Sequence, residues 1–259
     1  MNIPRPKLNV IELALFGIFF ATLAYLGGRY RTQVELQPYL SRGGAELKVL
    51  ADRFGPGRNT RYGEEWIIRD FFSDQRDGVF VDVGANHHQR ENNTYFLETT
   101  LGWSGVAIEP QIKFANGWAS SRPKTKFIPL FVSDVSNREA TLYVPSNDLI
   151  ASATPAFVEA EGGTSVKPLK VNTTTLDDIL ERSGISRIDF LSVDVELHEP
   201  EVLKGFSIER FQPRLVCIES HPEVRQQILD YFAAHGYMVV GKYLRADTEN
   251  LWFAPRARA

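Results

Sequence analysis

The residues best suited to chemistry begin with a glycine that follows a short apolar run. Val79 to Val83 shows no helical period and is typical of a buried parallel strand, which Gly84 ends at once. With Ala85 and Asn86, this glycine forms a turn whose backbone can approach a ligand closely. Glu109 lies 25 residues further on, after a second apolar run, where an acid can accept hydrogen bonds from both hydroxyls of a ribose. The spacing favours a nucleoside cofactor, and a tight turn with a solvated strand end is the alternative.

A second group of acids and histidines follows two other apolar runs, residues 189–193 and 215–218. If both runs are parallel strands, their carboxyl ends meet at one edge of a sheet, which is where open α/β sheets place their sites. Carboxylates and imidazoles there can hold a hydroxyl group and take its proton. Alternatively, the acids only favour the positive end of a helix that starts there. A metal site is conceivable, but the spacing matches no strong metal motif, and we predict none. The group comprises Asp194, Glu196, His198, Glu219 and His221.

Strands and helices alternate along the chain from residue 61 onward. Apolar spacing predicts helices over residues 61–72, 94–101, 112–120 and 223–234, and strands over residues 106–108, 126–132 and 140–144. The last strand-like segments, residues 237–243 and 251–253, are predicted to form an antiparallel hairpin. Residues 145–168 have little regular pattern and predict a loop that covers or selects substrate.

Five motifs follow one another in order between residues 62 and 253: YGEE at 62–65, VFVDVGAN at 79–86, GWSGVAIEP at 102–110, TTLDDIL at 174–180 and IDFLSVDVELHEPEVLKGF at 188–206. Together they resemble the FkbM-type S-adenosylmethionine-dependent methyltransferases. The resemblance implies an α/β fold: a Rossmann-like class I methyltransferase sheet that ends in a C-terminal antiparallel hairpin. A final antiparallel strand is typical of such enzymes and not of nicotinamide-dependent dehydrogenases, and the first loop also lacks a full G-x-G-x-x-G pattern.

The resemblance implies S-adenosylmethionine as cofactor and assigns roles to the residues above. An acid after the third strand of such folds often binds the adenine amino group, which makes Asp134 a candidate, with a simple turn residue as the equal alternative. Asp194 and Glu196 occupy the family's Asp-Val-Glu. The cofactor-binding candidates are Asp82, Gly84, Ala85, Asn86, Glu109 and Asp134; the catalytic candidates are Asp194, His198 and His221; the substrate-binding candidates are Glu196 and Glu219.

The chain departs from the family pattern at two positions. His88 and Leu197 stand where members of the family usually have a glycine. A Cβ at residue 88 restricts positive φ and is expected to narrow the space beside the cofactor, so either the loop takes another path or the pocket is altered.

The composition sets further limits. The formal net charge of −3 and the absence of a basic run with interleaved aromatics give no reason to expect a nucleic-acid partner. Cys217 is the one cysteine, so it forms no internal disulfide and is expected to be a small buried hydrophobic residue.

The N-terminal segment differs in character. Val10 to Gly28 is 19 residues long with a single charge, Glu12. As a helix it would span about 28 Å, close to the roughly 30 Å of a bilayer's hydrocarbon core. We therefore predict a membrane anchor over residues 1–31, a linker or stalk over 32–60 and a methyltransferase-like domain over 61–259. A cleaved signal peptide and a buried core helix are the alternatives, and the balanced flanking charges do not fix the orientation.

The sequence thus favours a single-pass membrane protein that methylates a hydroxyl group of a sugar, a glycolipid or a small metabolite. Because S-adenosylmethionine is a cytosolic metabolite, the catalytic domain is expected on the cytoplasmic side of the membrane. The alternatives are a binding or scaffolding module that has lost methyl transfer, and a nicotinamide-dependent oxidoreductase.

Overall fold

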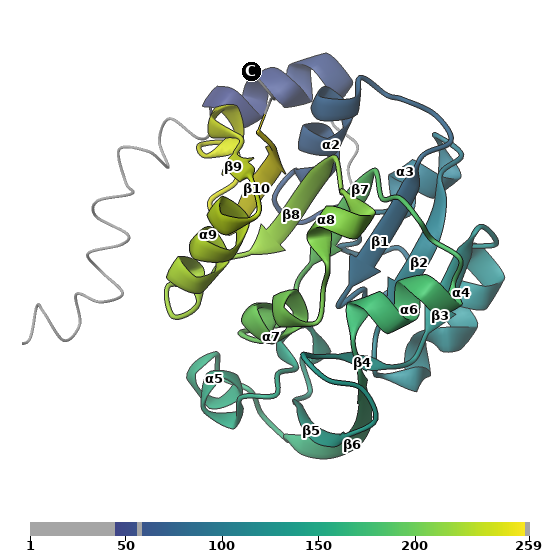
Figure 1. The fold of residues 1–259 in the computed structure, drawn as a ribbon, viewed down its shortest axis with the longest axis vertical. Helices are drawn as coiled ribbons and strands as arrows, with labels where there is room; N and C mark the ends of the chain where they lie inside the picture. The colour runs from purple at the N-terminus through teal and green to yellow at the C-terminus, as the bar shows by residue number, and fades with distance from the viewer. Residues whose placement is uncertain (1–44, 56–58, 257–259) are drawn as a thin grey trace, which may run out of the picture.

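A mostly parallel sheet forms the centre of the computed structural model, which describes residues 45–55 and 59–256 (Figure 1). Within these residues the main sheet has seven strands in the order β3-β2-β1-β7-β8-β10-β9. β10 runs antiparallel to both β8 and β9, and the other neighbours are parallel. The predicted Rossmann-like sheet with a C-terminal antiparallel hairpin is confirmed. Its strands are β1 (Val79–Val83), β2 (Ser104–Ile108), β3 (Thr125–Ile128), β7 (Phe190–Val193), β8 (Leu215–Glu219), β9 (Tyr237–Val239) and β10 (Asn250–Pro255).

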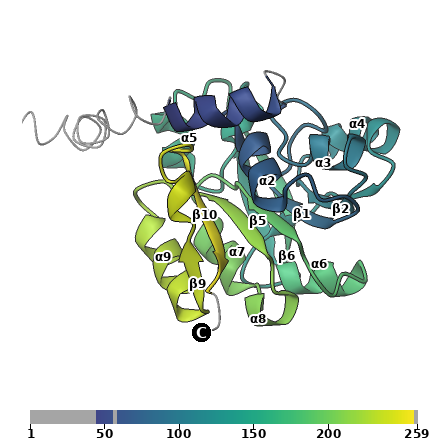
Figure 2. The ribbon, with the colours of Figure 1, turned by 90° about the horizontal axis from the view of Figure 1, so that it is seen from above.

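Helices cover both faces of this sheet, as the view from above shows (Figure 2). One face carries α2 (Glu64–Phe72), α3 (Tyr95–Thr99) and α4 (Ala115–Ser121), the last preceded by η1 (Ile112–Phe114). The opposite face carries α6 (Leu176–Arg182), α7 (Glu199–Lys204), α8 (Ile208–Phe211) and α9 (Arg225–Ala234).

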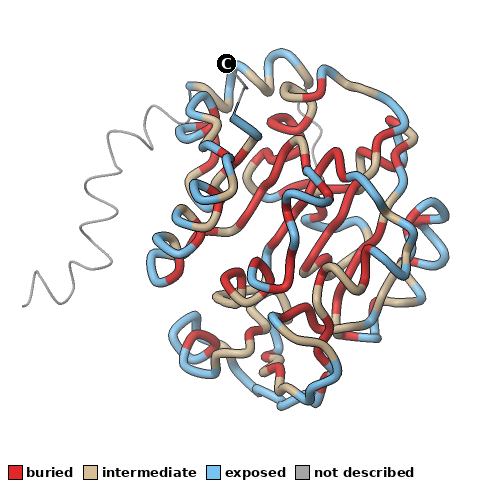
Figure 3. The backbone as a smooth tube through the Cα atoms, in the orientation of Figure 1, coloured by how far each residue is buried: buried red, intermediate tan, exposed pale blue. Residues whose placement is uncertain are grey.

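The strands are apolar on both faces because each face is buried under helices. In β1, Phe80 packs with the cluster that contains α2 and α3, whereas Val81 and Val83 pack with the cluster that contains α6 to α9. Figure 3 shows the buried strands between more exposed helices. Full burial of one such side chain contributes about 1.5 to 3 kcal/mol, so the two clusters supply the main stabilisation that holds the strand ends in place. Cys217 lies in one of them, buried and unpaired, as predicted.

Pro129 divides a segment that the sequence analysis took as one strand, residues 126–132. β3 ends at Ile128, and the chain resumes as β4 (Phe131–Val132) in a separate three-stranded sheet of order β4-β6-β5. Proline has no N–H to give to a sheet ladder, so the single-strand prediction was wrong for this reason. The other two strands of the small sheet are β5 (Glu139–Val144) and β6 (Lys167–Thr174).

The segment over residues 145–168 is more regular than the predicted loop. It contains η2 (Asp148–Ile150) and α5 (Pro155–Ala160), and β6 begins near its end. In Figure 1 this segment and the small sheet lie together at the end of the main sheet toward which β1 runs. Asn86 Nδ2 donates a hydrogen bond of 3.3 Å to the carbonyl of Asp148, so the segment contacts the loop after β1.

The predicted membrane span, residues 10–28, lies outside the described residues. Within the described part of the chain, no helix has the length and apolar character needed to cross a membrane. Residues 45–54 of the predicted linker are helical, and Leu47 and Leu50 from this helix pack against the α2 and α3 cluster. Arg53 also pairs with Asp70 of α2 at 2.6 Å. This part of the linker is therefore packed on the domain.

Candidate active site

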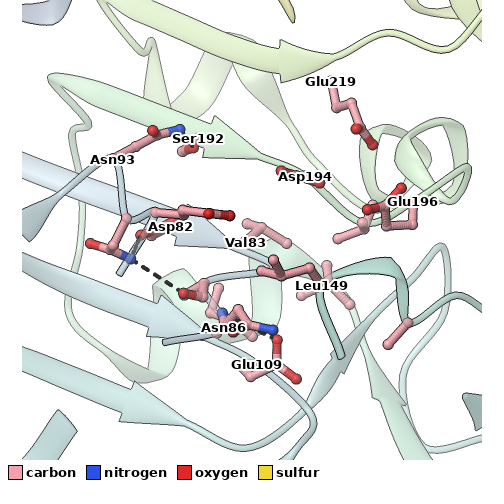
Figure 4. A pocket seen from close by; sticks show the side chains of 18 of the residues that line it. Asp82, Val83, Asn86, Asn93, Glu109, Leu149, Ser192, Asp194, Glu196 and Glu219 are labelled. Atoms are coloured by element: carbon pink, nitrogen blue, oxygen red, sulfur yellow. Dashed lines mark hydrogen bonds between the residues drawn. The ribbon is translucent and has the colours of Figure 1, made fainter. Parts of the chain in front are cut away.

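A pocket opens at the carboxyl ends of β1, β2, β7 and β8 (Figure 4). These ends lie side by side because the four strands are parallel neighbours, and this is where open α/β sheets bind their ligands. The pocket brings together eight of the predicted site residues: Asp82, Gly84, Ala85, Asn86, Glu109, Asp194, Glu196 and Glu219.

Gly84 is the residue that allows the loop after β1 to lie so close to its neighbour. Its φ is +81°, in the left-handed region that side chains rarely adopt. A Cβ at this position would lie 1.7 Å from the carbonyl oxygen of Asp194. Only glycine fits there, so the backbone of residues 84–86 runs directly across the ends of β1 and β7.

Glu109 is fixed at the end of β2 by the same loop. Its side chain accepts hydrogen bonds from the amides of Gln111, at 2.8 Å, and Asn86, at 3.2 Å. Burial raises the pKa of Glu109 to about 6, and these two amide hydrogen bonds oppose the rise. The carboxylate is therefore ionised at neutral pH, and it lines the pocket beside Asn86 (Figure 4).

Asp82 is buried near the end of β1 and contacts the segment that follows the residue 84–86 loop. It accepts hydrogen bonds from Asn92 Nδ2, at 3.1 Å, and Thr94 Oγ1, at 3.0 Å. Burial raises the pKa of Asp82 to about 6. Arg122, with no exposed surface, donates to Asn92 Oδ1 and pairs with Glu98 at 2.7 Å. This network fixes the far side of the loop.

Three carboxylates converge on the other side of the pocket, those of Asp194, Glu196 and Glu219 (Figure 4). Burial, and next the charge of Glu219, raise the pKa of Asp194 well above its usual range. Burial also raises the pKa of Glu196 to about 7, against the effect of a hydrogen bond from His221. Asp194 itself is exposed to the solvent of the pocket, so its ionisation depends on what occupies the pocket.

His221 sits beside this cluster and outside the pocket lining. Its Nε2 lies 3.4 Å from Glu196 Oε2 and 3.2 Å from Glu219 Oε2. Hydrogen bonds to Glu196 and then Glu219 raise the pKa of His221 to about 11. At neutral pH the ring is an imidazolium and has no lone pair with which to accept a proton.

His198 and Asp134, by contrast, do not line the pocket. His198 immediately precedes α7; its Nε2 lies 3.1 Å from Ser133 Oγ, and its ring contacts Phe131. Burial lowers the pKa of His198, but its ring packs against Ser133 and Phe131 and does not line the pocket in which a general base was predicted. Asp134 is exposed, because the chain leaves the main sheet at Pro129, well before this residue. Asp134 therefore does not line the pocket, and the structure gives no support to its predicted role beside an adenine ring.

The two departures from the family pattern do not obstruct the pocket. His88 stacks on His87 and lies against Gly117 of α4, so the expectation that it narrows the cofactor space is wrong. Leu197 has a φ of 74°, and the preceding Glu196 has a φ of 52°. The leucine therefore adopts a left-handed conformation, which favours glycine, at a cost of about 1 to 3 kcal/mol.

Other lining residues had no signal in the single sequence or only an ambiguous one. Asn92 and Asn93 stand shortly before α3, where asparagine often caps a helix, but Asn93 Nδ2 instead donates a hydrogen bond of 3.1 Å to Ser192 Oγ of β7. Glu64 lines the pocket, with its pKa raised to about 7 by burial, while Glu65 instead accepts a hydrogen bond from the Asn59 amide. Further lining residues come from segments whose position only the fold determines: Tyr62, Gln111, Leu130, Phe131, Leu142, Asp148, Leu149, Glu249 and Asn250.

Comparison with known proteins identifies one matching family and several solved structures with low sequence identity. The family described as "Methyltransferase FkbM domain" matches residues 82–239. A precorrin-6y C5,15-methyltransferase from Geobacter metallireducens is 10% identical, covering 80% of this chain and 95% of its own, with a TM-score of 0.42. The methyltransferase domain of METTL16 is 14% identical, covering 79% of this chain and 70% of its own, with a TM-score of 0.45. No curated protein matches the sequence.

Proposed function

Because the chain belongs to the FkbM methyltransferase family, we propose that it is an S-adenosylmethionine-dependent enzyme that methylates a hydroxyl group of a sugar, a glycolipid or a small metabolite. The observation that carries the cofactor assignment is the position of Gly84. Its missing Cβ lets residues 84–86 pass over the ends of β1 and β7, next to the ionised Glu109. An adenosine moiety between this loop and Glu109 would have its ribose hydroxyls at the carboxylate.

Bound there, S-adenosylmethionine would supply a methyl group for in-line transfer to the acceptor's hydroxyl oxygen. The new C–O bond would replace the C–S bond, and S-adenosylhomocysteine would leave as a neutral thioether. The acceptor's proton goes to a base, and no covalent intermediate with the protein is needed. We assign the base to Asp194, because its side chain is exposed to the pocket at the end of β7, and in its ionised form the raised pKa makes it a stronger base than an ordinary carboxylate.

The two histidines are less suited to that role. His221 is already protonated at neutral pH, and His198 points toward Ser133 and Phe131. We assign to His221 the holding of Glu196 and Glu219, which fixes where these side chains meet the acceptor.

The membrane location belongs to the same proposal. An anchor over residues 10–28 would hold the domain at the cytoplasmic surface, where S-adenosylmethionine is available and where a lipid-linked acceptor would lie within reach. Protease protection of the full-length chain in right-side-out and inverted vesicles tests this orientation.

Calorimetry of the full-length chain in detergent, titrated with S-adenosylhomocysteine and separately with NAD, tests the cofactor assignment. We expect one S-adenosylhomocysteine per chain, no binding of NAD, and loss of the signal in Glu109→Ala. Glu223→Ala removes an exposed acid away from the pocket and serves as the matched control. Binding of NAD alone would indicate an oxidoreductase, and binding of neither ligand would indicate a scaffolding module; either result contradicts the proposal.

A further inference from the structure

Three side chains at the edge of the pocket have the arrangement of ligands around one metal ion. A carboxylate oxygen of Glu196, one of Glu219 and a ring nitrogen of His221 all lie within 4.8 Å of one another. His221 Nε2 lies 3.4 Å and 3.2 Å from the two carboxylate oxygens. Ligands that share an ion at about 2.1 Å are separated by roughly 3.0 to 3.4 Å, depending on the geometry. The two separations from His221 Nε2 match this range, and the two carboxylate oxygens lie within 4.8 Å of each other.

A second observation is that the carboxylates around this group are incompletely paired. Oε2 of Glu219 is buried and lies 3.2 Å from His221 Nε2, without making a well-aligned hydrogen bond. Glu199, with no exposed surface, also has one oxygen atom without a hydrogen-bond partner among the described residues, and its charge interacts with both Glu219 and His221. Buried carboxylate oxygens without partners cost free energy, and a cation among them would remove that cost.

We propose that Glu196, Glu219 and His221 bind one divalent cation, which faces the methyl acceptor from the wall of the pocket opposite Glu109. The donor set, two carboxylates and one imidazole, suits Mn²⁺ or a similar ion. The cation would take the place of the proton that His221 shares with the two carboxylates. This inference rests on the proposed methyl transfer, because it concerns the acceptor side of the same pocket.

The position of the site determines what the ion can do. Glu196 and Glu219 line the pocket with Asp194, and three protein ligands leave up to about three coordination positions open on a six-coordinate ion. An acceptor with two neighbouring oxygens, such as a sugar diol, can occupy two of them. Coordination lowers the pKa of a bound hydroxyl and fixes its direction, so the attacking oxygen would be both activated and oriented next to Asp194. The acceptor class is therefore a chelating polyol or hydroxy acid.

Mn²⁺ binding to the full-length protein, measured by electron paramagnetic resonance after treatment with a chelator, tests the site without any activity assay. We expect one ion per chain, at least a tenfold loss of affinity in Glu219→Gln and in His221→Ala, and no change in Glu223→Gln. Glu219→Gln removes a charge from a crowded cluster, so it is expected to fold, and its thermal transition should be no lower than that of the wild type.

The outcomes separate this inference from the proposed function. The absence of Mn²⁺ binding at millimolar concentration in the wild type would overturn the site. Unchanged affinity in a folded Glu219→Gln would also overturn it, because the ion would then be bound elsewhere. Titration with S-adenosylhomocysteine in the presence of the chelator is measured on the same sample, so a failure of the cofactor assignment is detected independently.

Discussion

Replacement of Gly84 by alanine should lower both the stability of the fold and the affinity for the cofactor. The loss of stability has two parts, a conformational cost and a steric cost. The positive φ of +81° alone costs an alanine about 1 to 2 kcal/mol. In addition, the new Cβ would lie 1.7 Å from the carbonyl oxygen of Asp194, where 3.0 Å is the lower limit for such contacts, so the backbone must separate by at least 1.3 Å. We expect this displacement to cost about 2 kcal/mol more, as overpacking in a core does, and to lower affinity for S-adenosylhomocysteine more than about a hundredfold.

Gly184→Ala isolates the conformational part of that cost. Gly184 has a φ of +69°, but a Cβ there meets nothing within 4 Å, and the residue lies far along the chain from the pocket loops. Urea unfolding of both variants should therefore give the smaller loss for Gly184→Ala, with wild-type binding in calorimetry. Equal losses of unfolding free energy in the two variants, together with wild-type binding by Gly84→Ala, would refute the argument that the loop passes directly over Asp194.

Three further results are expected. Affinity for S-adenosylhomocysteine should fall as the pH drops through about 6, where Glu109 becomes protonated, and calorimetry of Glu109→Gln should show weaker binding without this dependence. Leu197→Gly should keep the affinity within about threefold of the wild type, since both residues can adopt the φ of 74°; a tenfold loss would show that the leucine side chain itself shapes the pocket. Burial raises the pKa of Glu199 to about 8 from an ordinary 4.5. At pH values between these two pKa values, the acid takes up a proton when the chain folds. The free energy of unfolding therefore decreases as the pH rises through this range. Chelator-treated Glu199→Gln should therefore gain stability relative to the wild type from pH 5 to pH 9, by up to about 1.4 kcal/mol per pH unit in urea unfolding, and parallel profiles would contradict the raised pKa.

The part of the fold that follows from periodicity could be predicted from the sequence. The strand over residues 79–83 has the predicted bounds, and the C-terminal hairpin pairs as expected, because buried strands and helical faces have distinct apolar periods. The small sheet was not predicted as such. Most residues of β6 are exposed, so its apolar pattern is weak. Its partner β4 is separated from β3 by Pro129 and Leu130, so the main signal for the break was one proline within an apolar run.

The same reasoning explains which site residues the sequence could place. Parallel topology brings the ends of neighbouring strands together, which is why Asp194 and Glu219 meet although 25 residues separate them. Parallel topology does not determine the direction of a side chain that lies beyond the end of its strand. Glu196 and Leu197 both adopt left-handed conformations, and after this reversal Glu196 faces His221 while His198 packs toward Ser133. Left-handed backbone at two successive residues other than glycine is disfavoured, so local sequence preferences argue against this turn. The choice between the two histidines therefore depends on a conformation that the rest of the fold imposes. For that reason, His221 rather than His198 is the histidine that can share a cation with the carboxylates.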